Sequence, residues 1–405
     1  MVVRRSVSAF YLFTGLRWFR LTGAIWMLYL LHVGWMLWQV GAAEGFFHVV
    51  GFLAAVPTGV YADRMGRRRS LVVGLIIAVI AGLAIYLTAP VSVLAGIGAM
   101  GLSSLSWSFI GGADQALLYD LTRSRPDARR AYRNVLARVN ALSLLSGAAA
   151  AVAGGWLAVH WGWAWPYVLA AGAEALAIPC VLLLPEPRRE PTPAAAFTAG
   201  GTWMDTLRTT KSAVRRLPGV LALVVFGAVL GVVATSNHLY AQTTLSVKGE
   251  TIVAVTAIIA VGGLLAALGS LLSRHLPPGP VSSGALRRGT LVLAALVAAV
   301  GVLPAAQSVG AFMASGLLDG GVDVLYVAEL SQASPDVLRA TVLSAPDMLF
   351  SLGMIVCFPA EGWAMQRYGP QAAYLALGVT LAAAALWLVR HASRGQPGLP
   401  AGESG

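Results

Sequence analysis

The stretch Gly59-Val-Tyr-Ala-Asp63-Arg64-Met-Gly66-Arg67-Arg68-Arg69 ends one long apolar run, at residues 38–62, and precedes another, at 70–88. A helix needs about 20 apolar residues to cross the hydrocarbon core of a bilayer. Each run is long enough for this. The stretch between them is therefore interpreted as a short basic loop that joins two membrane-spanning helices.

The composition of the whole chain agrees with this interpretation. Of 405 residues, 58% are hydrophobic and 11% are charged, whereas soluble domains are about 45–50% apolar and about 25% charged. The net charge of +11 is not gathered in one patch, which argues against nucleic acid as a partner. The two cysteines, Cys180 and Cys357, both lie in apolar runs. No disulfide framework, metal site or cofactor is expected from them.

The apolar runs predict an all-α membrane protein, because a β-barrel would have short alternating segments instead. Twelve runs are long enough to be spans: 10–33, 38–62, 70–88, 91–121, 132–158, 163–184, 218–242, 251–273, 288–305, 308–331, 338–364 and 370–390.

The basic residues test this count. With both termini on one side, that side holds 23 of the 28 lysines and arginines, and the other side holds only Lys248 and Arg367. The remaining three, Arg17, Arg20 and Arg138, fall within spans. Cytoplasmic loops carry the excess of positive charge. Both termini are therefore expected in the cytoplasm, and the protein in the plasma or inner membrane.

The spans divide into two sets of six. We expect an N-terminal bundle at 1–184, a cytoplasmic linker with an amphipathic helix at 185–217, a C-terminal bundle at 218–391 and a disordered tail at 392–405. The two sets also resemble each other, because Gly112-Ala-Asp114 matches Gly321-Val-Asp323 at an offset of 209 residues. This predicts a duplicated six-helix unit, as is common in transporters.

The basic stretch resembles the loop 2–3 signature of the major facilitator superfamily. In that pattern Gly59 would permit close helix packing, and Gly66 a tight turn. Asp63 would accept bonds from a helix N-terminus or pair with an arginine, and Arg64, Arg67 and Arg68 complete the motif. The resemblance extends over nearly the whole chain. It implies alternating-access transport, with spans 1, 4, 7 and 10 around a central cavity, but no particular substrate.

Ionisable residues inside spans are costly and are candidates for function. Arg17 and Arg20 share a face of the first span. They either face the cavity, where they would bind an anionic group or a carboxylate such as Asp114 or Asp323, or reach the cytoplasmic surface. Asp114, Asp319 and Asp323 are candidates for proton coupling. The alternative is a structural salt bridge with one of the arginines.

Two further sets are candidates. Asp120, Arg130, Glu329 and Arg339 lie at the cytoplasmic ends of spans 4, 5, 10 and 11, which suggests ion pairs that close an inner gate; the two acids are otherwise interfacial residues. Asn237, Tyr240 and Gln242 near the outer end of span 7 either bind substrate or bond neighbouring helices.

These features favour a proton-coupled exporter of small amphipathic drugs or metabolites. The chain departs from drug–proton antiporters, since Ala150 and Ala151 stand where those carry Gly-Pro in span 5. Uptake or uniport of a small organic anion is the alternative, and a non-transporting scaffold is a remote one. No enzyme motif appears. The expected partners are a small-molecule substrate, protons if transport is proton-coupled, and the bilayer around a monomer.

Overall fold

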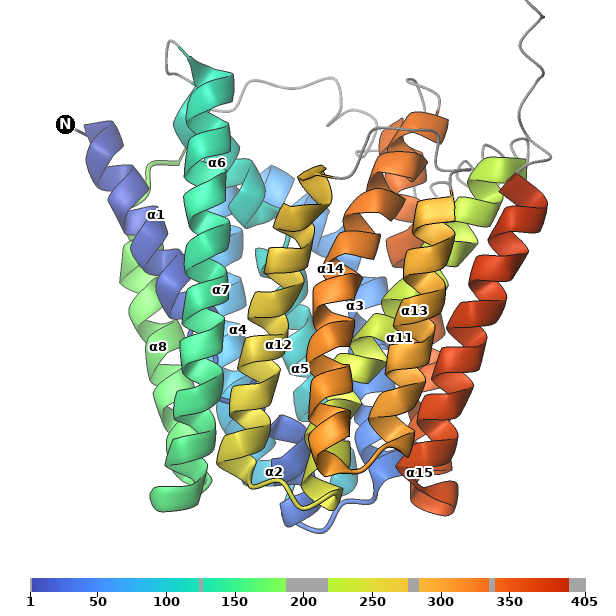
Figure 1. Cartoon of the computed structure of the whole chain (residues 1–405). Coiled ribbons are helices and arrows are strands. Elements are labelled where there is room, and N and C mark those ends of the chain that lie inside the picture. The colour runs from blue at the N-terminus through green and yellow to red at the C-terminus, as the bar shows by residue number, and fades with distance from the viewer. Residues whose placement is uncertain (1, 124–126, 187–217, 276–283, 335–338, 393–405) are drawn as a thin grey trace, which may run out of the picture.

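The computed structural model describes residues 2–123, 127–186, 218–275, 284–334 and 339–392, and its described residues are almost all helical (Figure 1). Residues 187–217 of the expected linker and 393–405 of the expected tail lie outside this part. The helices are α1 (Val2–Trp18), α2 (Trp26–His32), α3 (Leu37–Met65), α4 (Arg67–Thr88), α5 (Val93–Ile110), α6 (Ala113–Arg123), α7 (Ala128–His160), α8 (Ala164–Leu182), α11 (Pro218–Val247), α12 (Ile252–Leu272), α13 (Gly284–Val302), α14 (Ala305–Ala333) and α15 (Arg339–Ala392).

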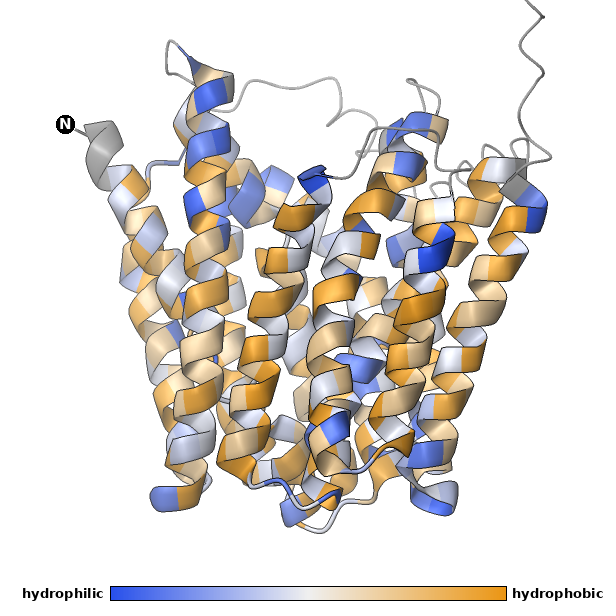
Figure 2. Ribbon diagram, viewed as in Figure 1, coloured by the Kyte–Doolittle hydropathy of each residue, from blue (hydrophilic) through white to orange (hydrophobic). Residues whose placement is uncertain are grey.

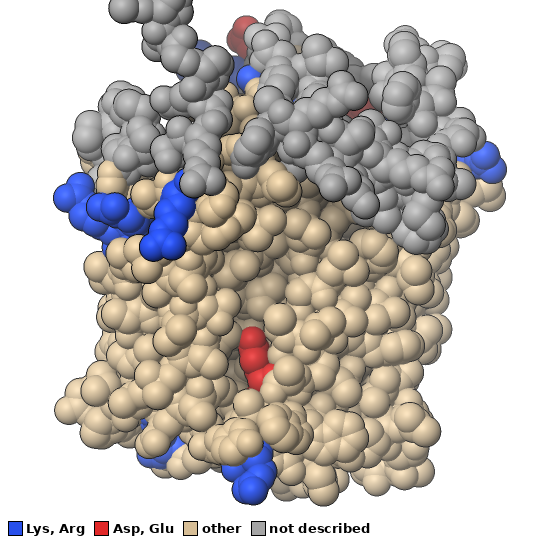
Figure 3. Space-filling model, turned by 90° about the vertical axis from the view of Figure 1, so that its right-hand side faces the viewer, with Lys and Arg blue, Asp and Glu red and all other residues tan. Residues whose placement is uncertain are grey.

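Ten helical segments of the described chain are long and apolar enough to cross a membrane. Their outer surfaces are mostly hydrophobic, and polar residues gather toward the end where the N-terminus lies (Figure 2). One side of the molecule has basic side chains at its upper and lower margins and a nearly uncharged band between them (Figure 3). Within that band an acidic side chain is visible in a hollow. The chain is therefore a multi-pass membrane protein.

The helices pack as two groups. Helices α1–α8 mainly contact one another, as do α11–α15, and the groups meet where α3 packs on α15 and α7 packs on α12. The N-terminus and the last turn of α15 lie at the same end of the bundle (Figure 1). Residue Gly369 in α15 has φ 82° and ψ 167°, so this element is two helices joined at a kink.

Two segments that the sequence predicts as continuous spans are each interrupted. Residues 19–25 separate α1 from α2, and Gly111–Gly112 separates α5 from α6. Gly112 has a φ of 78°, which glycine adopts readily because it has no Cβ. The predicted spans at 10–33 and 91–121 did not reveal these interruptions, because apolar content does not report where the backbone leaves helical geometry.

Small residues seal one end of the interface between the groups. At Gly362 a Cβ would lie 2.5 Å from the Leu37 carbonyl oxygen, and at Gly155 it would lie 2.2 Å from the Thr256 Oγ1. A Cβ at Gly41 would meet the Phe358 carbonyl oxygen at 2.8 Å. These positions all lie toward the end where α2 meets α3. The two groups are therefore in backbone contact at that end.

Lys248 ties the same end of the second group together. Its Nζ donates to the carbonyl oxygens of Val300, Gly301 and Leu303, at 2.6–2.9 Å, and to the Ser308 Oγ at 2.7 Å. The three carbonyls belong to the C-terminal end of α13, where unsatisfied acceptors and the helix dipole favour a cation.

We expect Lys248→Met to lower the stability of the purified protein by about 2 kcal/mol, because several charge-assisted hydrogen bonds are lost at once. Thermal unfolding in detergent should show a melting temperature about 5 °C lower. Arg367→Met is the matched control, since the Arg367 guanidinium lies over the Tyr368 ring at 5.7 Å and forms no ion pair with a described residue. Equal effects of the two changes would contradict the assigned role of Lys248.

Candidate functional site

A cavity lies between the two groups of helices. It has a volume of about 560 Å³ and is lined by residues of α1, α6 and α7 on one side and of α11 and α12 on the other. Most of its lining is apolar, including Phe10, Phe13 and Leu136. Its ionisable lining residues are Arg17, Arg20, Asp114 and His238. Such a site suits an amphipathic molecule better than a wholly polar one.

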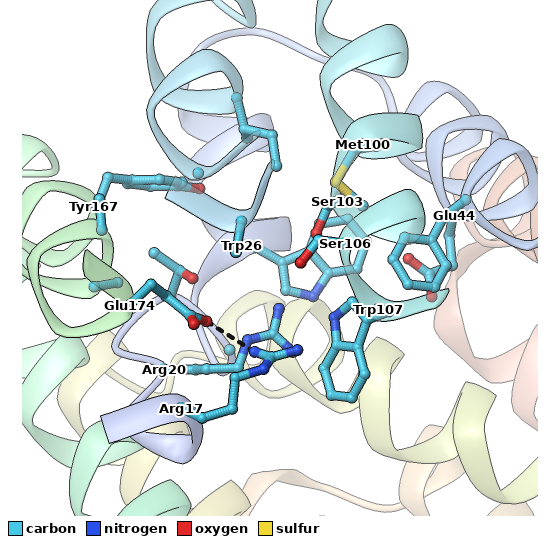
Figure 4. Close-up of a pocket in the computed structure, with 18 of the residues that line it drawn as sticks. Arg17, Arg20, Trp26, Glu44, Met100, Ser103, Ser106, Trp107, Tyr167 and Glu174 are labelled. Carbon is cyan, nitrogen blue, oxygen red and sulfur yellow. Dashed lines mark hydrogen bonds and ion pairs between the residues drawn. The ribbon is translucent and has the colours of Figure 1, made fainter. Parts of the chain in front are cut away.

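A second cavity, of about 250 Å³, is lined by the first group of helices and by Leu239 of α11. Residues of α2, α3, α4, α5 and α8 line it, and Arg17, Arg20 and Gly23 line both cavities. Figure 4 shows Arg17, Arg20, Trp107 and Glu174 at one side of this space. The two arginines therefore stand where the cavities adjoin.

A buried ion pair holds the first arginine. The Arg17 Nη1 lies 2.8 Å from the Glu174 Oε1, and the two side chains are 6% and 10% exposed. The guanidinium carbons of Arg17 and Arg20 lie 4.4 Å and 4.8 Å from the centre of the Trp107 ring. Cation–π contacts of this kind are strongest where water is excluded. The side chains thus face the interior, and they do not reach toward the surface.

The partner of Arg17 differs from those that the sequence suggested. Glu174 in α8 forms the ion pair, and neither Asp114 nor Asp323 does so. Sequence reasoning missed Glu174 because nothing in the sequence relates the faces of α1 and α8. The available signal was a lone acid in the middle of an apolar run, which at membrane depth requires a partner.

Asp114 does not lie with the other two candidate aspartates. Asp114 is half-buried in the first turn of α6, where its Oδ1 accepts from the Gln115 backbone N–H at 2.6 Å. Asp319 lines a separate cavity of about 60 Å³ in the second group, with Asn237. Asp323, one turn further along α14, is exposed. Of the three, Asp114 alone lines the central cavity.

His238 is a candidate that the sequence analysis passed over. It lines both the central cavity and the small cavity beside Asp319, and its ring faces Phe312 at 6.4 Å between centroids. The side chain is exposed to these spaces. A histidine within an apolar span was the signal that would have found it.

The polar residues of α11 bond to neighbouring helices. The Asn237 Nδ2 donates to the Ser315 Oγ at 3.0 Å, and the Tyr240 hydroxyl donates to the Phe358 carbonyl at 2.7 Å. The Gln242 Nε2 donates at 3.3 Å to the carbonyl of Gly23, in the break after α1. Of the two interpretations of these residues, helix bonding is the one that these contacts support.

The basic loop joins the helices of the first group. Gly66 has a φ of 110° and forms the turn between α3 and α4, as expected. Arg67 pairs with the Asp120 carboxylate and donates to the Ala116 carbonyl at 2.8 Å. Arg68 donates to the Leu184 carbonyl at 3.2 Å, at the end of α8. The loop therefore connects α4 to α6 and to the end of α8.

Other expectations for this loop differ from the structure. A Cβ at Gly59 would meet nothing within 4 Å, so this glycine does not mark a close helix contact here. Asp63 and Arg64 are exposed, and Asp63 forms no ion pair with a described residue.

Among the described ion pairs, none joins two of the four residues of the expected gate. Asp120 pairs with Arg67 instead of Arg130. Arg130 is exposed, and neither it nor Glu329 forms an ion pair within the described ranges. Arg339 is exposed at the start of α15. The role of these residues as a gate stays a prediction.

We expect Glu174→Gln to cost about 3–5 kcal/mol of stability, because it leaves the Arg17 charge buried without a counter-ion. The double variant Arg17→Met, Glu174→Met should lose less, since no unpaired charge remains. Thermal unfolding of the purified protein measures both.

The control is Glu186→Gln. Glu186 lies 3.6 Å from Arg68 in a half-exposed pair, which should contribute less than about 1 kcal/mol. If the single and double variants at residues 17 and 174 lose the same stability, the buried charge is not what makes Glu174 necessary.

Comparison with known proteins identifies a family for this chain. The sequence model of the Major Facilitator Superfamily matches residues 7–286. Among curated protein sequences, none matches the chain.

Solved structures share the fold. A crystal structure of a mutant of the nucleoside transporter NupG has a TM-score of 0.74 at 13% identity, and covers 96% of this chain and 100% of its own. An auto-inhibited POT family peptide transporter has a TM-score of 0.73 at 14% identity, with 97% of each chain covered. The human organic anion transporter MFSD10 has a TM-score of 0.60 at 19% identity, and covers 95% of this chain and 99% of its own. At these identities the likeness concerns the fold alone.

Proposed function

The chain belongs to the Major Facilitator Superfamily, a family of transporters, and we propose that it is a secondary active transporter that exports small amphipathic drugs or metabolites in exchange for protons. The observation that carries this proposal is the cavity of about 560 Å³ between the two groups of helices, with its apolar walls and four ionisable lining residues. Alternating access would expose this cavity to each side of the membrane in turn.

The topology we propose has twelve spans with both termini in the cytoplasm. In it, α1 and α2 form one interrupted span, α5 and α6 form another, and α15 supplies two spans that meet at Gly369. The distribution of arginines supports this orientation. The glycine contacts at Gly155 and Gly362 then seal the outer end, so the structure corresponds to a state closed to the outside.

Asp114 is our first choice for the residue that couples transport to protons. It shares the central cavity with Arg17, Arg20 and His238. A carboxyl group there gains or loses its proton according to which side of the membrane the cavity meets, and a nearby substrate charge shifts the balance. Asp319 and Asp323 remain second choices, because they lie on α14 away from this cavity.

Uptake or uniport of a small organic anion is the second candidate function. Arg20 favours it, since its side chain lines both cavities and forms no ion pair with a described residue. A substrate carboxylate would give Arg20 an ion-pair partner. The two candidates differ in direction: export protects cells from a toxic substrate, whereas uptake sensitises them.

We expect Asp63→Asn to reduce transport about tenfold or more while the protein still inserts in the membrane. Asp63 lies at the end of α3, the helix that packs along α15. When the cytoplasmic end closes, a carboxylate here would accept hydrogen bonds from the N-terminus of α15. The measurement is a drug and metabolite susceptibility panel in cells that express either form, with and without a protonophore.

The matched control for this panel is Asp127→Asn. Asp127 is an exposed acid before α7 whose side chain makes no capping hydrogen bond. Full activity of Asp63→Asn would contradict the gating role, and equal loss in both variants would indicate a general effect of surface charge.

We expect Asp114→Asn to abolish the proton dependence of transport and Asp323→Asn to retain it, because Asp114 alone of the two lines the central cavity. Substrate-driven proton flux in proteoliposomes, monitored with a pH-sensitive dye, measures this. If Asp114, Asp319 and Asp323 can each be replaced by asparagine without loss of proton flux, none of them is the coupling residue.

A further inference from the structure

Three buried polar atoms around the cavity of about 250 Å³ have no hydrogen-bond partner among the described residues. They are the Ser106 Oγ, the Tyr167 hydroxyl and the Glu174 Oε2. Ser106 and Tyr167 are each 2% exposed, and Glu174 is 8% exposed. Buried polar groups are nearly always bonded, so three unpartnered ones on the wall of one cavity indicate a polar occupant.

Arg20 adds a charge to the same wall. Its guanidinium lies over the Trp107 ring at 4.8 Å, and no acidic side chain of the described chain pairs with it. The two acids that line this cavity have other partners: Glu174 forms its ion pair with Arg17, and the Glu44 Oε1 lies 3.6 Å from the His48 Nε2. The planar guanidinium presents paired donors that match a carboxylate. The cavity therefore offers the Arg20 guanidinium beside the Glu174 Oε2 and two hydroxyls, with the buried Glu44 carboxylate elsewhere on its lining.

We propose that this cavity binds the head group of the transported molecule, and that the head group is a carboxylate flanked by a hydroxyl or an amino group. The carboxylate binds Arg20, and the neighbouring hydroxyl or amino group donates to the Glu174 Oε2. The Ser106 and Tyr167 hydroxyls, whose side chains line the same cavity (Figure 4), complete the hydrogen bonds of the proposed head group. This inference rests on the proposed transport function and names the substrate class of that site.

The size and position of the cavity agree with a small head group. A volume of about 250 Å³ corresponds to roughly eight water-sized groups. The cavity shares Arg17, Arg20 and Gly23 with the larger one between the halves. An apolar substituent on the acid therefore has the adjoining apolar cavity in which to lie.

The first experiment measures binding by the purified full-length protein. Calorimetric titration and thermal shift are recorded with lactate, 3-phenyllactate and phenylalanine, and with the uncharged amide of 3-phenyllactate. We expect saturable binding of 3-phenyllactate, and at least about tenfold weaker binding of its amide, which cannot form the charged pair with Arg20. The des-hydroxy analogue 3-phenylpropionate should also bind more weakly, because the Glu174 Oε2 then stays unpartnered.

Conservative variants separate a binding role from a structural one. Removing a hydroxyl that has no partner should leave the stability of the empty protein unchanged or higher. We therefore expect Tyr167→Phe and Ser106→Ala to keep the melting temperature while weakening 3-phenyllactate about fivefold or more. Tyr86→Phe is the control, since the Tyr86 ring packs on Tyr167 at 5.6 Å but does not line the cavity.

Arg20→Gln should abolish the preference for 3-phenyllactate over its amide, whereas Arg138→Gln should preserve it, because Arg138 lines neither cavity. The proposal is overturned if none of the three acids binds at 10 mM, if acids and amide bind alike, or if Tyr167→Phe and Ser106→Ala leave affinity unchanged. Equal behaviour of acids and amide is the result expected of a cavity that holds only water.

The transport assay distinguishes this failure from failure of the proposed function. If cells show transport that depends on Asp63 while no acid binds the purified protein, the head-group site is wrong and the transporter assignment stands. If the acids bind through Arg20 but cross the membrane no faster with the protein than without it, the site stands and the transport proposal fails.

Discussion

The buried ion pair between Arg17 and Glu174 is the interaction on which the first half of the molecule depends. A charge at membrane depth is tolerated only with a partner, and here the partner comes from α8, more than 150 residues away in sequence. The pair holds the end of α1 against α8 at the point where the first span breaks. Arg20 and Gly23 follow within that break and thereby come to line both cavities.

The break itself is stabilised from the other half of the chain. Backbone groups freed from a helix need hydrogen-bond partners inside a membrane, and the Gly23 carbonyl accepts from Gln242 of α11. Gly154 of α7 approaches the same segment so closely that a Cβ would lie 1.8 Å from the Leu21 carbonyl oxygen. The irregular segment is thus enclosed by both halves, which places Arg20 and Gly23 beside the central cavity.

The close glycine contacts between the halves and the Arg67–Asp120 ion pair lie toward opposite ends of the bundle. At one end the halves touch through glycines such as Gly41 and Gly362, which leave no space for a side chain. Toward the other end, the Arg67–Asp120 pair joins α4 to α6 within one half. At one end the two halves are in close contact with each other, and at the other end the ion pair stabilises a single half. This arrangement suits two rigid halves that rotate against each other.

Much of the architecture follows from sequence alone, and the reason is local. Because a span must be apolar over about 20 residues, the runs at 38–62 and 70–88 predict α3 and α4, and Gly66 predicts the turn between them. The sequence pattern of each span does not indicate which faces of the helices contact each other. The bonds of Arg17 to Glu174, of Arg67 to Asp120 and of Gln242 to Gly23 join segments 53 to 219 residues apart. Only tertiary packing decides such pairs, since the rotation of each helix depends on all its neighbours, and it alone turned Ser106, Tyr167 and Glu174 toward one cavity.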